Sequence, residues 1–144
     1  MQKNGFTLLE VMLVIALVLV VGFLVAAFST NFIAESAVRQ APEQFRSIFN
    51  KAQAYACSGR NHNSWGVHYE GATLTLFEGD SYAGRDRAFD ESIPISDYVD
   101  VVGFDEVIFR RPDGHPNQVF SDIRFLSGGA QPWAISLNSE GVVQ

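Results

Sequence analysis

The sequence predicts an α+β fold in which one long N-terminal helix precedes an antiparallel sheet. Three observations support this prediction. An uncharged apolar run covers Val11–Phe28, an amphipathic helical pattern follows from Ala34, and short alternating segments begin after Gly59. Helical periodicity in the first part and strand-like alternation in the second are typical of a helix that packs on one face of a sheet.

The composition limits the number of domains and the kind of partner. The chain has 144 residues, 47% of them hydrophobic, which is enough for one globular domain. Its net charge is -6 and its pI is about 4.9. Sequence-independent binding to DNA depends on basic groups that neutralise phosphates, so nucleic acid is not an expected partner. No metal or other cofactor is expected either.

The single cysteine, Cys57, excludes an intramolecular disulfide and any metal site of the CxxC kind. It falls in an apolar helical pattern, where a free cysteine acts as a small packing residue. We therefore predict a packing role for Cys57, with an intermolecular disulfide as the alternative.

The apolar run Val11–Phe28 has about the length of a membrane-spanning helix. A secretory signal peptide would have a shorter apolar core, about 7–15 residues, followed by a small-x-small cleavage site. The run is longer than that, and residues 26–30 form a poor cleavage site. A plain membrane anchor explains the run but leaves Glu10 unexplained.

Glu10 is a carboxylate directly before the apolar run. An acidic group costs about 2.5 kcal/mol or more near the centre of a bilayer and less near its interface. Glu10 is therefore a candidate functional residue that needs a partner of opposite charge. The alternative interpretation is that Glu10 only marks the membrane interface.

The N-terminus contains a short polar leader with Lys3, then Gly5, then Phe6-Thr7-Leu8-Leu9-Glu10-Val11 and the apolar run. This string resembles the class III signal of type IV prepilins and type II secretion pseudopilins. The resemblance implies that a prepilin peptidase cleaves between Gly5 and Phe6 and methylates the new amino group of Phe6. It also implies a pilin-like fold, and an assembly role in which Glu10 pairs with the N-terminal amine of a neighbouring subunit.

The chemistry of these residues fits such a role. Gly5 has no side chain, so catalytic groups can approach the peptide bond that follows it. Cleavage creates a positive amine on Phe6, and residues four apart, such as Phe6 and Glu10, share one helix face. Two charges that are costly in hydrocarbon become less costly when they pair there. Pairing would also fix the axial register of an apolar helix.

The resemblance implies three parts of the chain: a leader at residues 1–5, a transmembrane or filament-core helix at 6–29, and a globular head at 30–144 that includes the second half of the helix. The protein would cross the inner (cytoplasmic) membrane once, with its head on the extracytoplasmic side, and later join a filament. The implied partners are the prepilin peptidase, other pilin or pseudopilin subunits, the inner-membrane assembly platform and membrane lipid.

An amphipathic pattern continues the helix beyond the apolar run. Its apolar positions recur every three or four residues: Ala34, Ala37, Val38, Ala41, Phe45, Ile48, Phe49, Ala52, Tyr55 and Ala56. Gly59 is a typical residue just past a helix end, which predicts a helix over Phe6–Cys57. Pro42 should kink this helix, and Gly22 should weaken its first half.

The sequence after Gly59 predicts strands with turns between them. The expected strands are Trp65–Glu70, Thr73–Glu78, Tyr98–Val102, Glu106–Arg111, Val119–Leu126 and Trp133–Leu137, with a last piece near Val142–Val143. Glu70-Gly71 predicts a tight hairpin, and Pro112-Asp113-Gly114 and Ser127-Gly128-Gly129 predict turns. The stretch Gly79–Ile95 has little pattern and is predicted to be a surface loop.

Short head motifs carry a second resemblance. They are Ser64-Trp65-Gly66-Val67-His68-Tyr69, Val107-Ile108-Phe109 with Asp113-Gly114 after it, and Ile135-Ser136-Leu137-Asn138-Ser139-Glu140-Gly141-Val142-Val143. Their order is similar to that of H-type (GspH/FimT-type) minor pseudopilins and minor pilins. Some FimT-like pilins take up DNA through a C-terminal Gly-Arg-x-Arg tail. Here the tail reads Gly141-Val142-Val143-Gln144, which does not favour DNA binding.

Other candidate sites are weaker. The three histidines, at His62, His68 and His115, have no metal-ligand spacing. The loop carboxylates match no calcium motif and are predicted to form a solvated acidic loop: Asp86, Asp90, Glu91, Asp97 and Asp100. The basic clusters are Arg110-Arg111 and Arg85-x-Arg87.

Three classes of function remain for such a chain. The first is a structural minor pilin or pseudopilin without enzymatic activity. The second is a binding module displayed on a filament, as a receptor for DNA or a secreted substrate. The third is an anchored hydrolase, which no sequence motif supports because no serine lies in a nucleophile elbow.

Overall fold

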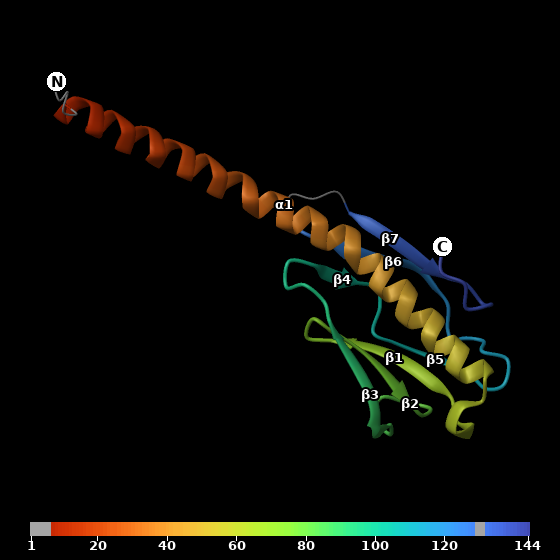
Figure 1. The fold of residues 1–144 in the computed structure, drawn as a ribbon. Coiled ribbons are helices and arrows are strands. Elements are labelled where there is room, and N and C mark those ends of the chain that lie inside the picture. The colour runs from red at the N-terminus through yellow and green to blue at the C-terminus, as the bar shows by residue number, and fades with distance from the viewer. Residues whose placement is uncertain (1–6, 129–131) are drawn as a thin grey trace. The chain divides into compact units, whose positions relative to one another are not determined.

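The structure is a computed structural model that describes residues 7–128 and 132–144; the side chains of residues 25–32 also lie outside the description. It confirms the α+β fold, with a long helix followed by antiparallel strands (Figure 1). In chain order the elements are α1 (Leu8–Cys57), η1 (Arg60–His62), β1 (Trp65–Glu70), β2 (Thr73–Glu78), β3 (Asp86–Pro94), β4 (Asp100–Val102), β5 (Glu106–Phe109), β6 (Phe120–Leu126) and β7 (Trp133–Leu137).

The chain divides into two compact units, Met1–Ile33 and Ala34–Gln144. Helix α1 runs through both Gly22 and Pro42, so neither residue ends it. The second unit contains the part of α1 from Ala34 to Cys57 and all of the strands, and it forms the head.

The head contains two antiparallel sheets instead of the single sheet that the sequence predicted. The larger sheet has the strand order β3-β2-β1-β5, and the smaller has the order β4-β6-β7. Figure 1 shows both sheets along the second half of α1. The sheets separate because β5 pairs back onto β1, whereas β4 pairs forward onto β6. Strand alternation alone does not specify such pairing.

The hairpin between β1 and β2 confirms the predicted tight turn. Glu70 pairs with Thr73, which leaves Gly71 and Ala72 as a two-residue loop. Both loop residues have positive φ values, 55° and 60°. Two consecutive positive φ values are typical of the type I′ turn, whose twist matches that of the flanking strands.

Strand β3 corrects the prediction of a surface loop over Gly79–Ile95. Residues Asp86–Pro94 form a nine-residue strand that pairs with β2. Most of its side chains are exposed because it is an edge strand, so its sequence lacks the usual apolar alternation. Charged side chains and a terminal proline are common on sheet edges because they discourage pairing with other chains.

The core of the head lies between the second half of α1 and both sheets. The helical stripe is buried as predicted, with only Ala37 and Tyr55 partly exposed. Phe45 lies at its centre, with ring centroids 5.8 Å from Phe49, 5.6 Å from Phe104 and 5.0 Å from Phe125. These edge-on contacts join α1 to the loop before β5 and to β6.

The end of α1 is organised by Gly59, which has a left-handed conformation with φ of 65°. The backbone N–H of Ser58 donates to the carbonyl of Ala54 at 2.9 Å, and that of Gly59 donates to Ala56 at 3.1 Å. This confirms the predicted helix end. Cys57, the last helical residue, is exposed, which corrects its predicted packing role. It ends the helix one position after the buried Ala56, where the stripe turns away from the core.

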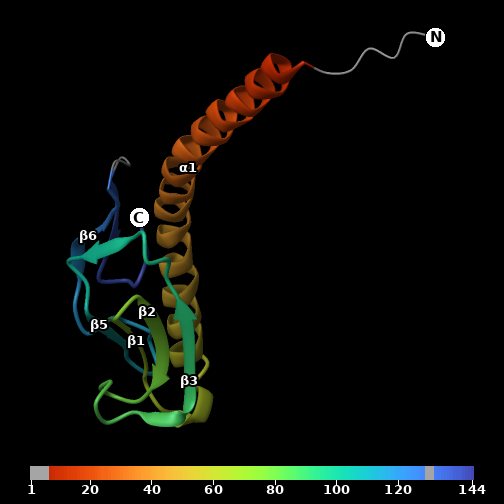
Figure 2. The ribbon, with the colours of Figure 1, turned by 90° about the vertical axis from the view of Figure 1, so that its left-hand side faces the viewer.

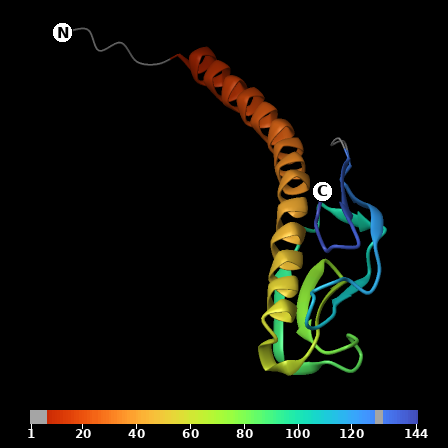
Figure 3. The ribbon, with the colours of Figure 1, turned by 90° about the vertical axis from the view of Figure 1, so that its right-hand side faces the viewer.

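Edge strand β3 lies beside the second half of α1 (Figures 2 and 3). An ion pair joins the two elements, because Lys51 Nζ lies 2.5 Å from Glu91 Oε2. A hydrogen bond from Lys51 to Glu91 raises the pKa of the lysine above its ordinary value.

The outer face of the larger sheet carries a second, smaller cluster. The ring of Phe77 lies against Gly66, where a Cβ atom would overlap it. Tyr82 contacts Phe77 edge-on at 5.6 Å and stacks on His68 at 3.8 Å. The segment between β2 and β3 is thereby held against the sheet.

Candidate functional site

The first turn of α1 positions Glu10, the predicted assembly residue. Thr7 precedes the helix, and its hydroxyl oxygen accepts a hydrogen bond from the backbone N–H of Glu10 at 3.3 Å. The backbone N–H groups of Glu10 and Val11 also donate to the carbonyl of Thr7, at 3.1 and 3.2 Å. Thr7 is therefore the N-cap of α1.

The N-cap was missed in the sequence, although the signal was present. Thr7-Leu8-Leu9-Glu10 fits the capping-box pattern of a Ser or Thr followed three residues later by Glu. A carboxylate in the first turn is also favoured by the positive end of the helix dipole. Glu10 thus has a local structural role in addition to its predicted pairing role.

The predicted processing residues, Gly5 and Phe6, lie outside the described residues. The structure therefore does not report the distance between Phe6 and Glu10. Cleavage after Gly5 and methylation of Phe6 stay predictions.

The first seventeen residues of α1, Leu8 to Leu24, are exposed on every face. Leu8 is 80% exposed, Phe23 76% and Leu19 68%. Glu10 carries the only charge among them. Exposed apolar surface of this extent marks a contact with another molecule or with lipid.

In the part of the chain that the structure describes, no helix is both long enough and apolar enough to cross a membrane. The predicted run Val11–Phe28 ends at residues 25–28, whose side chains lie outside the description.

The three histidines do not come together. His68 lies on β1 between Glu70 and Glu106, at 3.7 and 3.8 Å from their carboxylate oxygens. His115 Nδ1 lies 2.9 Å from the carbonyl of Ser139, and His62 lies in η1. Within residues 7–128 and 132–144, no group of three or more His, Cys, Asp or Glu residues could hold a metal ion.

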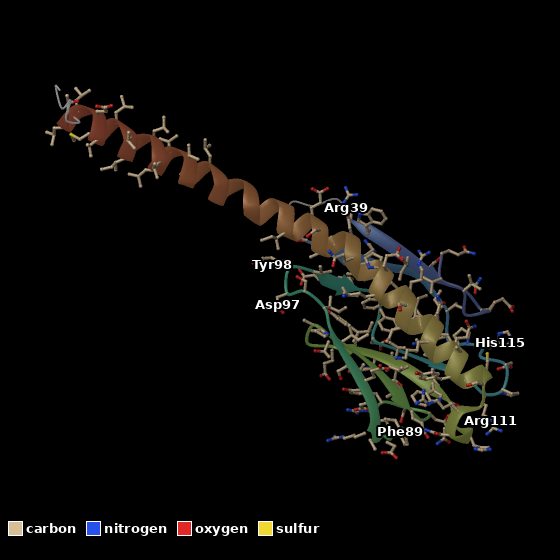
Figure 4. All side chains as sticks on the ribbon, viewed as in Figure 1. Arg39, Phe89, Asp97, Tyr98, Arg111 and His115 are labelled. Atoms are coloured by element: carbon tan, nitrogen blue, oxygen red, sulfur yellow. The ribbon has the colours of Figure 1, made fainter. Side chains whose placement is uncertain are left out.

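The charged clusters serve the fold. Arg85 Nε lies 2.8 Å from Asp90 Oδ2, and hydrogen bonding to Asp90 raises the pKa of the arginine. Arg111 Nη1 donates to the carbonyl of His62 at 2.8 Å, near the end of α1 (Figure 4). Three of the predicted loop carboxylates, Asp86, Asp90 and Glu91, thus lie on edge strand β3, where Asp90 pairs with Arg85 and Glu91 with Lys51. Asp97 follows this strand and Asp100 begins β4.

Two polar side chains with long-range hydrogen bonds, the buried Glu78 and the half-buried Gln53, escaped the sequence analysis. Glu78 is 4% exposed, and it accepts hydrogen bonds from the side-chain amides of Asn61 at 2.5 Å and Asn63 at 2.6 Å. Gln53 donates to the carbonyls of Gly114 at 3.2 Å and Glu140 at 2.7 Å. Both side chains link segments that are distant in sequence, so no local sequence pattern predicts their hydrogen bonds.

Comparison with known proteins gives one match, at the N-terminus. Residues 1–26 match the family model described as the prokaryotic N-terminal methylation motif. No curated protein and no solved structure matches the chain. A motif of this kind is recognised by prepilin peptidases and is typical of membrane-anchored pilin precursors, a structural class of proteins. The match supports assigning the chain to the type IV pilin and pseudopilin superfamily.

Proposed function

We propose that this protein is a minor pilin or pseudopilin of the H type, built into a type IV pilus or a type II secretion pseudopilus. A prepilin peptidase removes residues 1–5 and methylates the amino group of Phe6. The subunit resides in the inner membrane, with its head on the extracytoplasmic side, until the assembly platform adds it to the filament.

The observation that carries this proposal is the placement of Glu10. It lies in the first, capped turn of a helix whose next fourteen residues are apolar and exposed on all faces. A carboxylate at the start of such a helix is costly in hydrocarbon unless a cation pairs with it. The amine created on Phe6 of a neighbouring subunit is the cation that the motif makes available.

Residues 6–29 form the membrane and filament-core helix in this proposal, and residues 30–144 form the head. The exposed apolar surface of Leu8–Leu24 contacts lipid before assembly and the helices of other subunits after it. The buried stripe from Ala34 onward instead packs on the sheets of the same chain. The change in burial along one helix supports two different partners for its two halves.

The test is intact mass and N-terminal sequencing of the full chain after co-expression with a prepilin peptidase. We expect a chain that begins at methylated Phe6. A Gly5→Val variant, which adds a branched side chain at the cleavage site, should keep Met1 and run as an unshifted band. A chain that still begins at Met1 without the substitution, or is cut near Ala27, would contradict the proposal.

A further inference from the structure

A small pocket lies at the end of α1, where the helix meets edge strand β3. It has a volume of about 290 Å³ and is lined by Tyr55, Arg60, Trp65 and residues 88–91 of β3. Pockets for drug-sized ligands begin at about 300 Å³, so this one suits a group about the size of a single ring.

Three aromatic side chains form the walls. The rings of Tyr55 and Trp65 meet edge-on with centroids 4.8 Å apart, and Phe89 contacts Trp65 at 6.5 Å. Phe89 is 41% exposed and lies near the end of β3 that adjoins the last turn of α1 (Figure 4). An exposed phenylalanine beside two further rings offers an apolar surface to a ligand.

Arg60 lies across this aromatic wall. Its guanidinium carbon is 4.2 Å from the centroid of Tyr55 and 5.4 Å from that of Trp65. The indole N–H of Trp65 donates to the backbone carbonyl of Arg60 at 3.3 Å, which fixes the arginine after the turn at Gly59. A stacked guanidinium keeps its N–H groups directed away from the ring faces.

The charges around the pocket do not cancel. Lys51 is paired with Glu91, and Arg85 is paired with Asp90. No hydrogen bond or ion pair joins the Arg60 guanidinium to another residue in the described part of the chain. Arg60 is therefore the unbalanced positive charge of the pocket, and an anionic group is the complementary ligand.

We propose that this pocket binds a small organic carboxylate whose body is about one ring in size. Arg60 holds the carboxylate, and Tyr55 and Phe89 pack against the body. A sugar acid and an acidic amino-acid residue share this chemistry. The inference goes beyond the proposed function and does not depend on it, because all of these residues belong to the head.

The indole signals of the full-length chain provide a direct test. The chain has two tryptophans, Trp65 in the pocket and Trp133 on β7, so nitrogen-labelled tryptophan gives two indole N–H signals in an NMR spectrum. The probes are glucuronate, glucose and N-acetylglutamate. We expect a saturable shift of the Trp65 signal with one or both acids, little shift with glucose, and no shift of the Trp133 signal.

The two acids distinguish the source of the ligand. A response to glucuronate alone supports a sugar acid, a response to N-acetylglutamate alone supports an acidic residue, and a response to both supports the shared carboxylate chemistry. The absence of any saturable Trp65 shift, or an equal response to glucose, would overturn the proposal.

Variants test the role of the arginine. Arg60→Gln should weaken acid binding about tenfold, because it removes charge-assisted hydrogen bonds. Arg87→Gln is the matched control, since Arg87 is an exposed arginine of β3 that does not line the pocket. A dispersed Trp65 signal in each variant shows that the head is folded. Equal affinity in Arg60→Gln and the unsubstituted chain would also overturn the proposal.

Discussion

Thr7 and Glu10 are joined by a hydrogen bond in which the backbone N–H of Glu10 donates to the Thr7 hydroxyl at 3.3 Å. The contact uses the backbone of Glu10 and leaves its carboxylate available. Helix capping and charge pairing at this position can therefore be separated by substitution.

Glu10→Gln should lower incorporation into filaments while leaving processing largely intact. The variant keeps the backbone N–H that Thr7 accepts but removes the charge that pairs with a neighbouring amine. The measurement is the fraction of processed subunit in sheared filaments, with the processed band in whole cells as reference. Glu35→Gln is the control, because Glu35 is a glutamate of α1 that lies in the head.

Thr7→Ala completes this comparison because it removes the cap and keeps the carboxylate. It should fray the first turn at a cost of about 1 kcal/mol and reduce incorporation less than Glu10→Gln does. Normal incorporation of Glu10→Gln would count against charge pairing.

Glu78→Ala should destabilise the head by about 2–4 kcal/mol. The substitution removes the two charge-assisted hydrogen bonds that the buried Glu78 carboxylate accepts from the side-chain amides of Asn61 and Asn63. Urea unfolding of the full chain measures the change. Glu35→Ala serves as the control and should cost about 0.5 kcal/mol or less, since it removes only an exposed i,i+4 ion pair with Arg39. Equal effects of the two variants would refute the role of Glu78.

Gly66→Ala should destabilise the head by about 1–3 kcal/mol, because the new Cβ overlaps the ring of Phe77. The cost should nearly vanish in a Phe77→Ala background, which a double-mutant cycle in urea detects. Gly128→Ala is a suitable control, since a Cβ there meets nothing within 4 Å. Additive effects of Gly66→Ala and Phe77→Ala would show that the two residues are not in contact.

Alkaline pH should destabilise the head partly through Tyr69. Burial, with a smaller contribution from Asp100, raises the pKa of Tyr69 above its ordinary value. The unfolded chain then ionises first, so the stabilisation is present below about pH 10 and is lost as the pH rises through the folded-state pKa. Tyr69→Phe should flatten the fall in unfolding free energy above about pH 9, whereas the exposed Tyr98→Phe should not. Equal slopes in the two variants would contradict this assignment.

Where strands are rich in apolar residues and are flanked by turn residues, the sequence predicted the fold accurately. The bounds of β1, β2 and β7 agree with the prediction, because each is partly buried and flanked by turn residues. Strand β3 was missed because it is an exposed edge strand whose sequence is mostly charged and polar. The division into two sheets was missed because it depends on which strands pair, not on where strands occur.

The candidate sites show a similar contrast. Glu10 and its motif stand out in the sequence because a charge beside an apolar run is conspicuous. The pocket at Arg60 could not be predicted, since it brings the end of α1 against residues of β3 about thirty positions later, and only the folded head places them together.

The hydrogen bonds of Gln53 determine which contacts of the head can form only late in synthesis. Its amide reaches carbonyls that lie 61 and 87 positions later in the chain. During synthesis Gln53 leaves the ribosome before Gly114 and Glu140 have been made. Its two hydrogen bonds can therefore form only after those residues have been added. Long-range contacts of this kind slow folding, and they make the newly made helix dependent on protection until Glu140 has emerged. Removal of Glu140 and the residues after it should therefore disturb the C-terminal end of α1, where Gln53 lies.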